Sequence, residues 1–175
     1  MKMRWQPSLQ IIPHYESEPL YIQAIVNSIN NKLRSINWKP DLILASYHGI
    51  PKKYFDKGDP YHCYCHKTSR LIKESFNKDI PILTTFQSRF GPQEWLQPYT
   101  DKTLENLPKE GKKNILVISP GFSSDCVETL EEISIQGKES FLESGGEKFD
   151  TIPCLNDNED HIKLLVHLIN KSIRK

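Results

Sequence analysis

The chain has 175 residues, 37% hydrophobic and 26% charged, which is typical of one globular domain with a full core. A formal net charge of +1 argues against a nucleic-acid partner, and no apolar stretch approaches the length of a membrane span. Residues 1–7 lack the apolar core of a signal peptide, so we expect a cytoplasmic protein and leave peripheral membrane contact open. The cysteines are then expected to be reduced thiols.

Helical and extended segments are expected to alternate along the chain. The spacing of apolar residues predicts helices over residues 18–36, 63–77, 100–107, 125–144 and 157–173. Short apolar runs bounded by Gly or Pro predict strands over residues 41–47, 82–86, 114–119 and 151–155. Pro153 places the last of these strands at an edge of the sheet, because proline has no backbone N–H to donate. Loops are expected over residues 49–62 and 87–99.

This order of elements predicts an α/β fold. We expect a Rossmann-type three-layer domain with about four parallel strands and helices on both faces. Residues 1–17 contain two prolines and are expected to be irregular. So small a sheet suggests half of a larger two-domain protein.

A histidine, His48, ends the first predicted strand and is followed by Gly49. Ligands of open parallel sheets bind at the carboxyl ends of the strands. With a reference pKa of about 6.5, a histidine there can be neutral at pH 7 and act as a metal ligand or proton acceptor. The alternative is a histidine that only caps the strand and bonds to the backbone.

Acidic residues follow the strand at 114–119, in the first turns of the next predicted helix. They are Asp125, Glu128, Glu131 and Glu132. Glu128, Glu132 and Gln136 are spaced four apart, so they form one stripe on a helix. A solvated helix face is one explanation, and an acidic path for a divalent cation is the other. A neutral imidazole and carboxylates at one rim suit a metal or proton-transfer site.

Two further features allow two explanations each. The aromatic residues Phe90 and Trp95, in the loop at 87–99, either cover the core or wall a flat apolar ligand. Cys63 and Cys65 form a close pair flanked by histidines, which indicates ordinary thiols, an iron–sulfur cluster or a structural zinc site. Gly121 stands without the glycine run that a phosphate loop needs, which argues against a nucleotide-binding domain.

Several of these stretches together resemble one family. They are Ser46–Pro51, Thr85–Gly91 with Trp95-Leu96, Ser119–Phe122 and Asp125–Glu132. In order and spacing they resemble ferrochelatase of the proteobacterial type, which inserts ferrous iron into a porphyrin. The resemblance runs over nearly the whole chain but covers the C-terminal half of the family. It implies a chelatase-like domain at residues 18–175, with residues 1–17 as a remnant of a preceding domain and its crossing segment.

The resemblance also implies roles for individual residues. His48 and Glu128 match the pair taken jointly as catalytic groups and iron ligands. Glu132 matches the next acid of a path away from the site, and Asp125 matches an aspartate beside it. Trp95 and Tyr47 are expected to contact the porphyrin. Gln136 stands where many members have a third acid, and Cys126 stands where some have a histidine, so the outer end of the path departs from the family.

The implied function is insertion of ferrous iron into protoporphyrin IX to form protohaem. Ferrous iron is then a substrate and no resident cofactor is required, although Cys63 and Cys65 leave a [2Fe–2S] cluster open. The alternatives are a chelatase for another tetrapyrrole or metal, or an inactive half-module that binds porphyrin or metal. A missing N-terminal domain, supplied by a partner, or self-association would complete the cleft.

Overall fold

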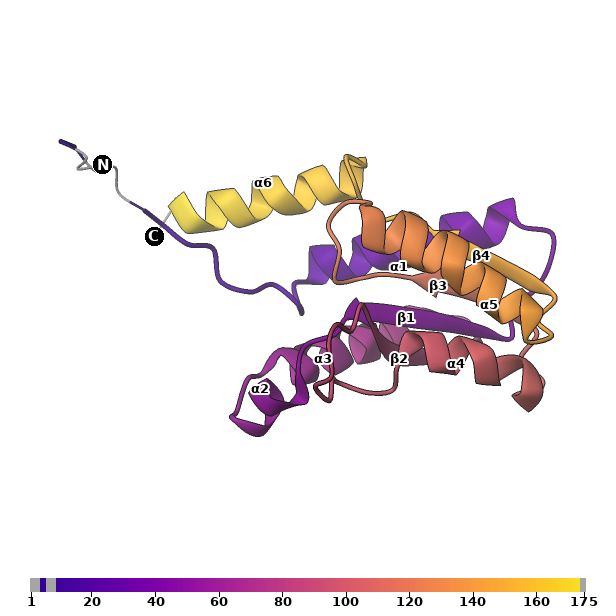
Figure 1. Cartoon of the computed structure of the whole chain (residues 1–175). Coiled ribbons are helices and arrows are strands. Elements are labelled where there is room, and N and C mark those ends of the chain that lie inside the picture. Colours follow the sequence, from indigo (N-terminus) through magenta and orange to yellow (C-terminus); the bar gives the residue numbers. More distant parts are fainter. Residues whose placement is uncertain (1–3, 6–8, 174–175) are drawn as a thin grey trace.

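Parallel strands form the centre of the structure, which is a computed structural model that describes residues 4–5 and 9–173 (Figure 1). Within those residues the strands form one sheet in the order β2-β1-β3-β4. The strands are β1 (Leu42–His48), β2 (Ile82–Gln87), β3 (Asn114–Ile118) and β4 (Lys148–Ile152), and every pairing is parallel. The predicted α/β fold with a parallel sheet is confirmed.

Helices cover both faces of the sheet (Figure 1). One face carries α1 (Pro19–Ser35), α3 (Tyr61–Ser75) and α6 (Glu159–Ile173). The other carries α4 (Thr100–Asn106), the 3-10 helix η1 (Leu107–Glu110), the π-helix η2 (Glu128–Gly137) and α5 (Lys138–Glu143). A short helix, α2 (Lys52–Asp56), follows β1.

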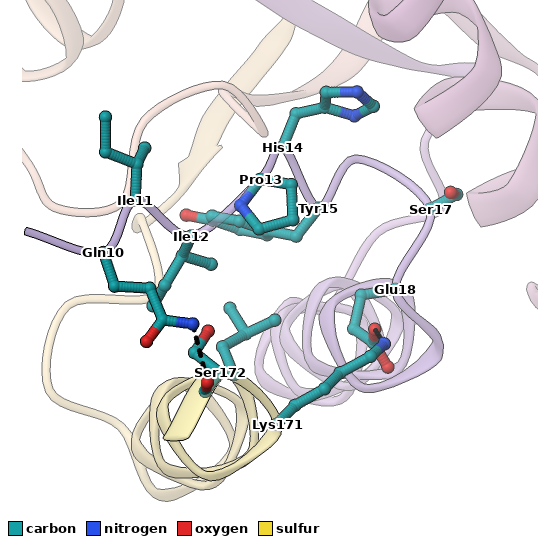
Figure 2. A pocket seen from close by; sticks show the side chains of 11 residues that line it. Gln10, Ile11, Ile12, Pro13, His14, Tyr15, Ser17, Glu18, Lys171 and Ser172 are labelled. Atoms are coloured by element: carbon teal, nitrogen blue, oxygen red, sulfur yellow. Dashed lines mark hydrogen bonds and ion pairs between the residues drawn. The ribbon is translucent and has the colours of Figure 1, made fainter. Parts of the chain in front are cut away.

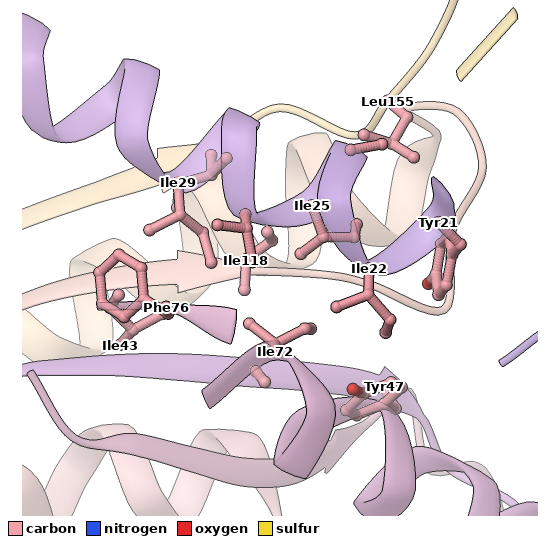
Figure 3. Packing of buried hydrophobic residues seen from close by; sticks show 14 of the residues in the cluster. Tyr21, Ile22, Ile25, Ile29, Ile43, Tyr47, Ile72, Phe76, Ile118 and Leu155 are labelled. Atoms are coloured by element: carbon pink, nitrogen blue, oxygen red, sulfur yellow. The ribbon is translucent and has the colours of Figure 1, made fainter. Parts of the chain in front are cut away.

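The inner strand β1 is buried on both faces, and its side chains alternate between two apolar clusters. Ile43, Ala45 and Tyr47 join the cluster beneath α1, α3 and α6, which Figure 3 shows from close by. Leu42 and Leu44 join the cluster beneath α4 and α5. This continuous apolar run is what a parallel strand with helices on both sides requires.

The structure differs from the predicted elements in three places. Helix α2 lies inside the predicted loop at 49–62, because its five residues bury no side chain and so carry no apolar periodicity. The predicted helix at 125–144 is a π-helix, η2, continued by α5. Strand β4 lies at the sheet edge as predicted, but it ends at Ile152, so that Pro153 follows the strand instead of interrupting its hydrogen bonds.

Residues 9–17 are irregular, as predicted, and are held against α3 through Glu16. The Glu16 carboxylate accepts hydrogen bonds from Lys67 Nζ (2.9 Å) and pairs with His14 Nδ1 (2.6 Å). Burial alone would raise the pKa of Glu16, but Lys67 and His14 outweigh that effect and lower its pKa from 4.5 to about 2. The division of the chain at residue 17 stays a prediction, and residues 1–3 and 6–8 lie outside the described residues.

Replacing Glu16 by glutamine is expected to lower the free energy of unfolding at pH 7 by about 1–2 kcal/mol. A carboxyl whose pKa is lower in the folded state stabilises the fold above its unfolded pKa, and that stabilisation is lost as the pH falls. The difference between wild type and Glu16→Gln should therefore shrink between pH 4.5 and about 2. Urea unfolding across this range measures it. Glu74→Gln, at an exposed pair with Arg70, is the control and should change little at any pH.

No helix in the described part of the chain combines the length and apolar character needed to cross a lipid bilayer.

Candidate functional site

The carboxyl ends of three neighbouring strands meet at one edge of the sheet. His48 ends β1, Gln87 ends β2, and the loop after β3 leads to Glu128 at the start of η2. Strands β1 and β3 are direct neighbours in the sheet. The structure therefore brings the predicted histidine and the first acid of the predicted path to one edge.

The half-buried imidazole of His48 is held in one tautomer by the backbone. Its Nδ1 lies 2.7 Å from the carbonyl oxygen of Gly49, which can only accept a hydrogen bond, so a neutral ring carries its proton on Nδ1. The Tyr61 hydroxyl donates to the carbonyl of His48 (2.8 Å), which fixes the backbone at this point. Nε2 therefore keeps a lone pair for a metal ion or a proton.

Glu128 is the first residue of η2 and is half-buried. A hydrogen bond from the Cys126 thiol lowers the pKa of Glu128, and the positive charge that His48 carries when protonated lowers it further. His48 and Glu128 therefore lie within electrostatic reach of each other. The edge therefore holds the imidazole of His48 and the carboxyl group of Glu128, whose pKa is lowered.

The buried side chain of Gln87 connects the backbone of Glu128 to strand β1, which carries His48. Its side-chain Nε2 donates to the backbone carbonyl of Glu128 (2.9 Å), and its Oε1 accepts from the Ser46 hydroxyl (2.7 Å). Its own backbone carbonyl accepts from the N–H of Gly49 (2.8 Å). The Ser46 hydroxyl also forms a hydrogen bond with the Thr100 hydroxyl (2.8 Å). The start of η2 is therefore connected to β1 and α4 through polar groups in the core. Sequence reasoning missed Gln87, although it ends β2 just as His48 ends β1.

Replacing Gln87 by leucine is expected to lower the free energy of unfolding by about 1–3 kcal/mol, because the Ser46 hydroxyl and the Glu128 carbonyl would lose a buried partner. Denaturant unfolding of the 175-residue chain measures the change. Gln93→Leu, at an exposed position in the same loop region, is the matched control. Equal stabilities of the two variants would contradict the role given to Gln87.

The second predicted acid, Glu132, lies at a cavity next to this edge. Its two carboxylate oxygens accept from the Ser88 N–H (2.7 Å) and the Ser88 hydroxyl (2.6 Å). Ser88 has a left-handed backbone (φ 63°), which turns both donors toward η2. The cavity, of about 380 Å³, is also lined by Gln136 and Arg89. The acidic path through Glu132 stays a prediction.

Asp125, the acid expected beside the site, is engaged in local hydrogen bonds. Its carboxylate accepts from the side-chain amide of Asn156 (2.8 Å), the N–H of Cys154 (3.1 Å) and the Thr129 hydroxyl (3.2 Å). These bonds outweigh burial and lower the pKa of Asp125. In this position it ties the loop before η2 to the segment after β4, and its place on the acidic path stays a prediction.

Trp95 lies in the loop that pairs with the segment after His48. The N–H of Leu96 donates to the carbonyl of Ile50 (3.0 Å), and a Cβ on Gly49 would lie 3.2 Å from the Trp95 ring and 2.9 Å from the Gln87 carbonyl. Glycine at position 49 therefore allows the two loops to close beside the imidazole. Trp95 is half-buried here, and its contact with a porphyrin stays a prediction.

Tyr47, the other expected porphyrin contact, lies in the core. Its side chain is 2% exposed and its hydroxyl lies 2.9 Å from the Ser69 hydroxyl of α3. Neighbouring residues of a strand point to opposite faces, so Tyr47 supports β1 from the face that α3 covers. Its role toward a porphyrin stays a prediction.

Cys63 and Cys65 are not brought together. They stand two apart on α3, a spacing at which helical side chains do not share a face. Cys63 is exposed, whereas Cys65 is 3% exposed and burial raises its pKa to about 12, which keeps the thiol protonated and a poor ligand. The pair does not fit the joint binding of a cluster. Among the residues that the structure describes, no group of three or more His, Cys, Asp or Glu side chains could hold a metal ion.

Comparison with known proteins agrees with the fold just described. The ferrochelatase family matches residues 1–173. Ferrochelatases from Allorhizobium ampelinum and Rhizobium meliloti are 55% and 56% identical to the chain, in each case over 99% of it and 51% of the relative. The ferrochelatase of Brucella anthropi is 52% identical over 99% of the chain and 50% of its own length. The chain thus spans about half the length of the curated relatives it matches, and it belongs to the ferrochelatase family.

Proposed function

We propose that this chain supplies one wall of an enzyme that inserts ferrous iron into protoporphyrin IX to form protohaem. The observation that carries the proposal is that His48 ends β1 and Glu128 begins η2 at the same carboxyl edge of the sheet, with Nδ1 of His48 bonded to the carbonyl of Gly49. Membership of the ferrochelatase family supports it. No observation favours another metal or tetrapyrrole, or a half that binds without catalysis.

The proposed chemistry needs two kinds of group. The porphyrin loses its pyrrole protons while the metal loses water, so the site must accept protons and bind ferrous iron for a short time. A neutral imidazole and a carboxylate suit both tasks, and we assign them jointly to His48 and Glu128. Binding of the rest of the macrocycle offsets the strain of holding it bent, with its lone pairs toward the metal.

The substrates in this proposal are protoporphyrin IX and ferrous iron, and no resident cofactor is required. The porphyrin contacts on the opposite wall are assigned to the half that the relatives carry beyond the match, with self-association as the alternative. We propose the cytoplasm as the compartment, with peripheral membrane contact. Four free cysteines without a disulfide support a reducing compartment.

The test is metal insertion in a fused protein. The chain is joined to the half of the Rhizobium meliloti ferrochelatase that lies outside the match, and protoporphyrin is supplied with ferrous iron without oxygen. We expect the porphyrin fluorescence to disappear and the absorbance spectrum of haem to appear, faster than with the relative's half alone. Binding of porphyrin without metal insertion would overturn the enzymatic proposal and leave a binding module. Preference for a different metal ion would assign a related chelatase instead.

A further inference from the structure

The last helix, α6, has more apolar surface than the described residues of the chain cover. Its Leu164 and Leu168 are buried in the cluster shared with α1. A second row of apolar side chains, each at least 36% exposed, runs along the helix beside them. This outer apolar face of α6 consists of Ile162, Leu165, Val166, Ile169 and Ile173.

The polar edge of α6, in contrast, is engaged within the chain. Glu18, at the start of α1, pairs with Lys171 Nζ (3.2 Å) and His167 Nε2 (3.4 Å). The side-chain amide of Asn27 donates to Asp160 (2.8 Å). A helix at a protein surface usually turns its polar side to solvent and its apolar side inward. In α6, however, the polar groups of Lys171, His167 and Asp160 bond to α1 and to the residue at its start, while the outer apolar face is exposed among the described residues.

The N-terminal segment extends this apolar surface. Figure 2 shows Gln10 turned toward the last turn of α6, where its amide donates to the carbonyl of Ser172 (2.6 Å), while Ile11 points away from the helix. Leu9 and Ile11 are 86% and 80% exposed. A cavity of about 300 Å³ is lined by this segment together with the end of α6. The N-terminal segment therefore places further exposed apolar side chains near the last turn of α6.

We propose that the outer apolar face of α6, with Leu9 and Ile11, is the docking surface for the half of the ferrochelatase polypeptide outside the match. The inference rests on the proposed two-domain enzyme. The relatives are about twice as long as this chain, so a domain of similar size has to be accommodated. Figure 1 shows α6 and the N-terminal segment extending past the end of the sheet at which β1 leads into α2. A domain seated there lies beside His48, where the opposite wall of a cleft is needed.

The test compares one substitution in two proteins, both with His48→Ala so that metal insertion does not enter the measurement. Ile169→Lys changes a side chain that is 49% exposed in this chain alone. In the chain alone we expect its unfolding temperature to move by less than about 2 °C. In the fused protein with the Rhizobium meliloti half, we expect a fall of about 5 °C or more, because the lysine enters a buried interface. Leu142→Lys, on α5 across the sheet, is the control and should have the same small effect in both proteins.

A second measurement uses the two halves as separate chains expressed together. Wild type should co-purify with the relative's half, Leu142→Lys should do the same, and Ile169→Lys should reduce recovery by about tenfold or more. Equal recovery of Ile169→Lys and wild type, or equal temperature shifts in the two proteins, would overturn the proposal. So would a stable dimer of the chain alone that Ile169→Lys dissociates, since a second copy would then cover the face. Light scattering of the eluted protein separates these outcomes.

Discussion

Replacing His48 by alanine is expected to abolish iron insertion in the fused two-domain protein, with a fall in kcat of about a hundredfold or more. The substitution removes Nε2, the ring nitrogen that does not take part in the hydrogen bond to Gly49 and that we propose as a metal ligand or proton acceptor. The imidazole makes its hydrogen bond to an adjacent residue, so the free energy of unfolding should change little. Anaerobic formation of haem from protoporphyrin and ferrous iron measures the rate, and denaturant unfolding of the chain checks the fold.

The matched control for this experiment is His66→Ala, an exposed histidine of α3. We expect the control to keep its rate within about twofold of wild type. Restoration of part of the lost rate by added imidazole would assign the defect to the missing ring. Turnover of His48→Ala at the rate of wild type would remove His48 from the mechanism.

The second large effect is expected from Glu128→Gln, with a fall in kcat of about a hundredfold. Glutamine keeps the shape of the side chain but removes the negative charge to which we assign a share of ferrous iron binding and proton acceptance. Glu131→Gln is the control, because Glu131 is exposed and its carboxylate accepts a single side-chain bond, from Gln136 (3.3 Å). The same haem-formation assay compares the two variants. Equal losses would show that general negative charge along η2 matters, and the specific pairing of Glu128 with His48 would be abandoned.

The position of His48 at the same sheet edge as the loop that leads to Glu128 was predictable, because strand ends are easy to recognise. An apolar run that stops at a polar residue before glycine marks the carboxyl end of a buried strand, and neighbouring parallel strands end at one edge. The same rule applies to Gln87 at the end of β2. Its connection to the carbonyl of Glu128 was not predictable, because that contact depends on how the loop after β3 returns to the sheet.

Side-chain direction decides which of the expected site residues face the same side of their element. Tyr47 precedes His48 and so points to the opposite face of β1, which strand geometry alone implies. Cys63 and Cys65 likewise point in different directions, because residues two apart on a helix do not share a face. Asp125 carries no such signal, since its partners Asn156 and Cys154 are distant in sequence and meet it through folding. Residue type and spacing in the sequence indicate which side chains could bind a ligand. The direction in which each side chain points decides which of them can bind the same ligand.

The π-helical geometry of η2 has a consequence for how this site can change during evolution. Each turn of a π-helix contains an extra residue compared with an α-helix, as if one amino acid had been inserted. Downstream, Phe141 of α5 is fully buried and anchors the helix to the sheet. Loss of a single residue from η2 would let the backbone return to α-helical bonding and would move Glu128 along the helix while Phe141 stays in place. An insertion or deletion in η2 could therefore exchange the side chain presented to His48 without altering the sheet that supports it.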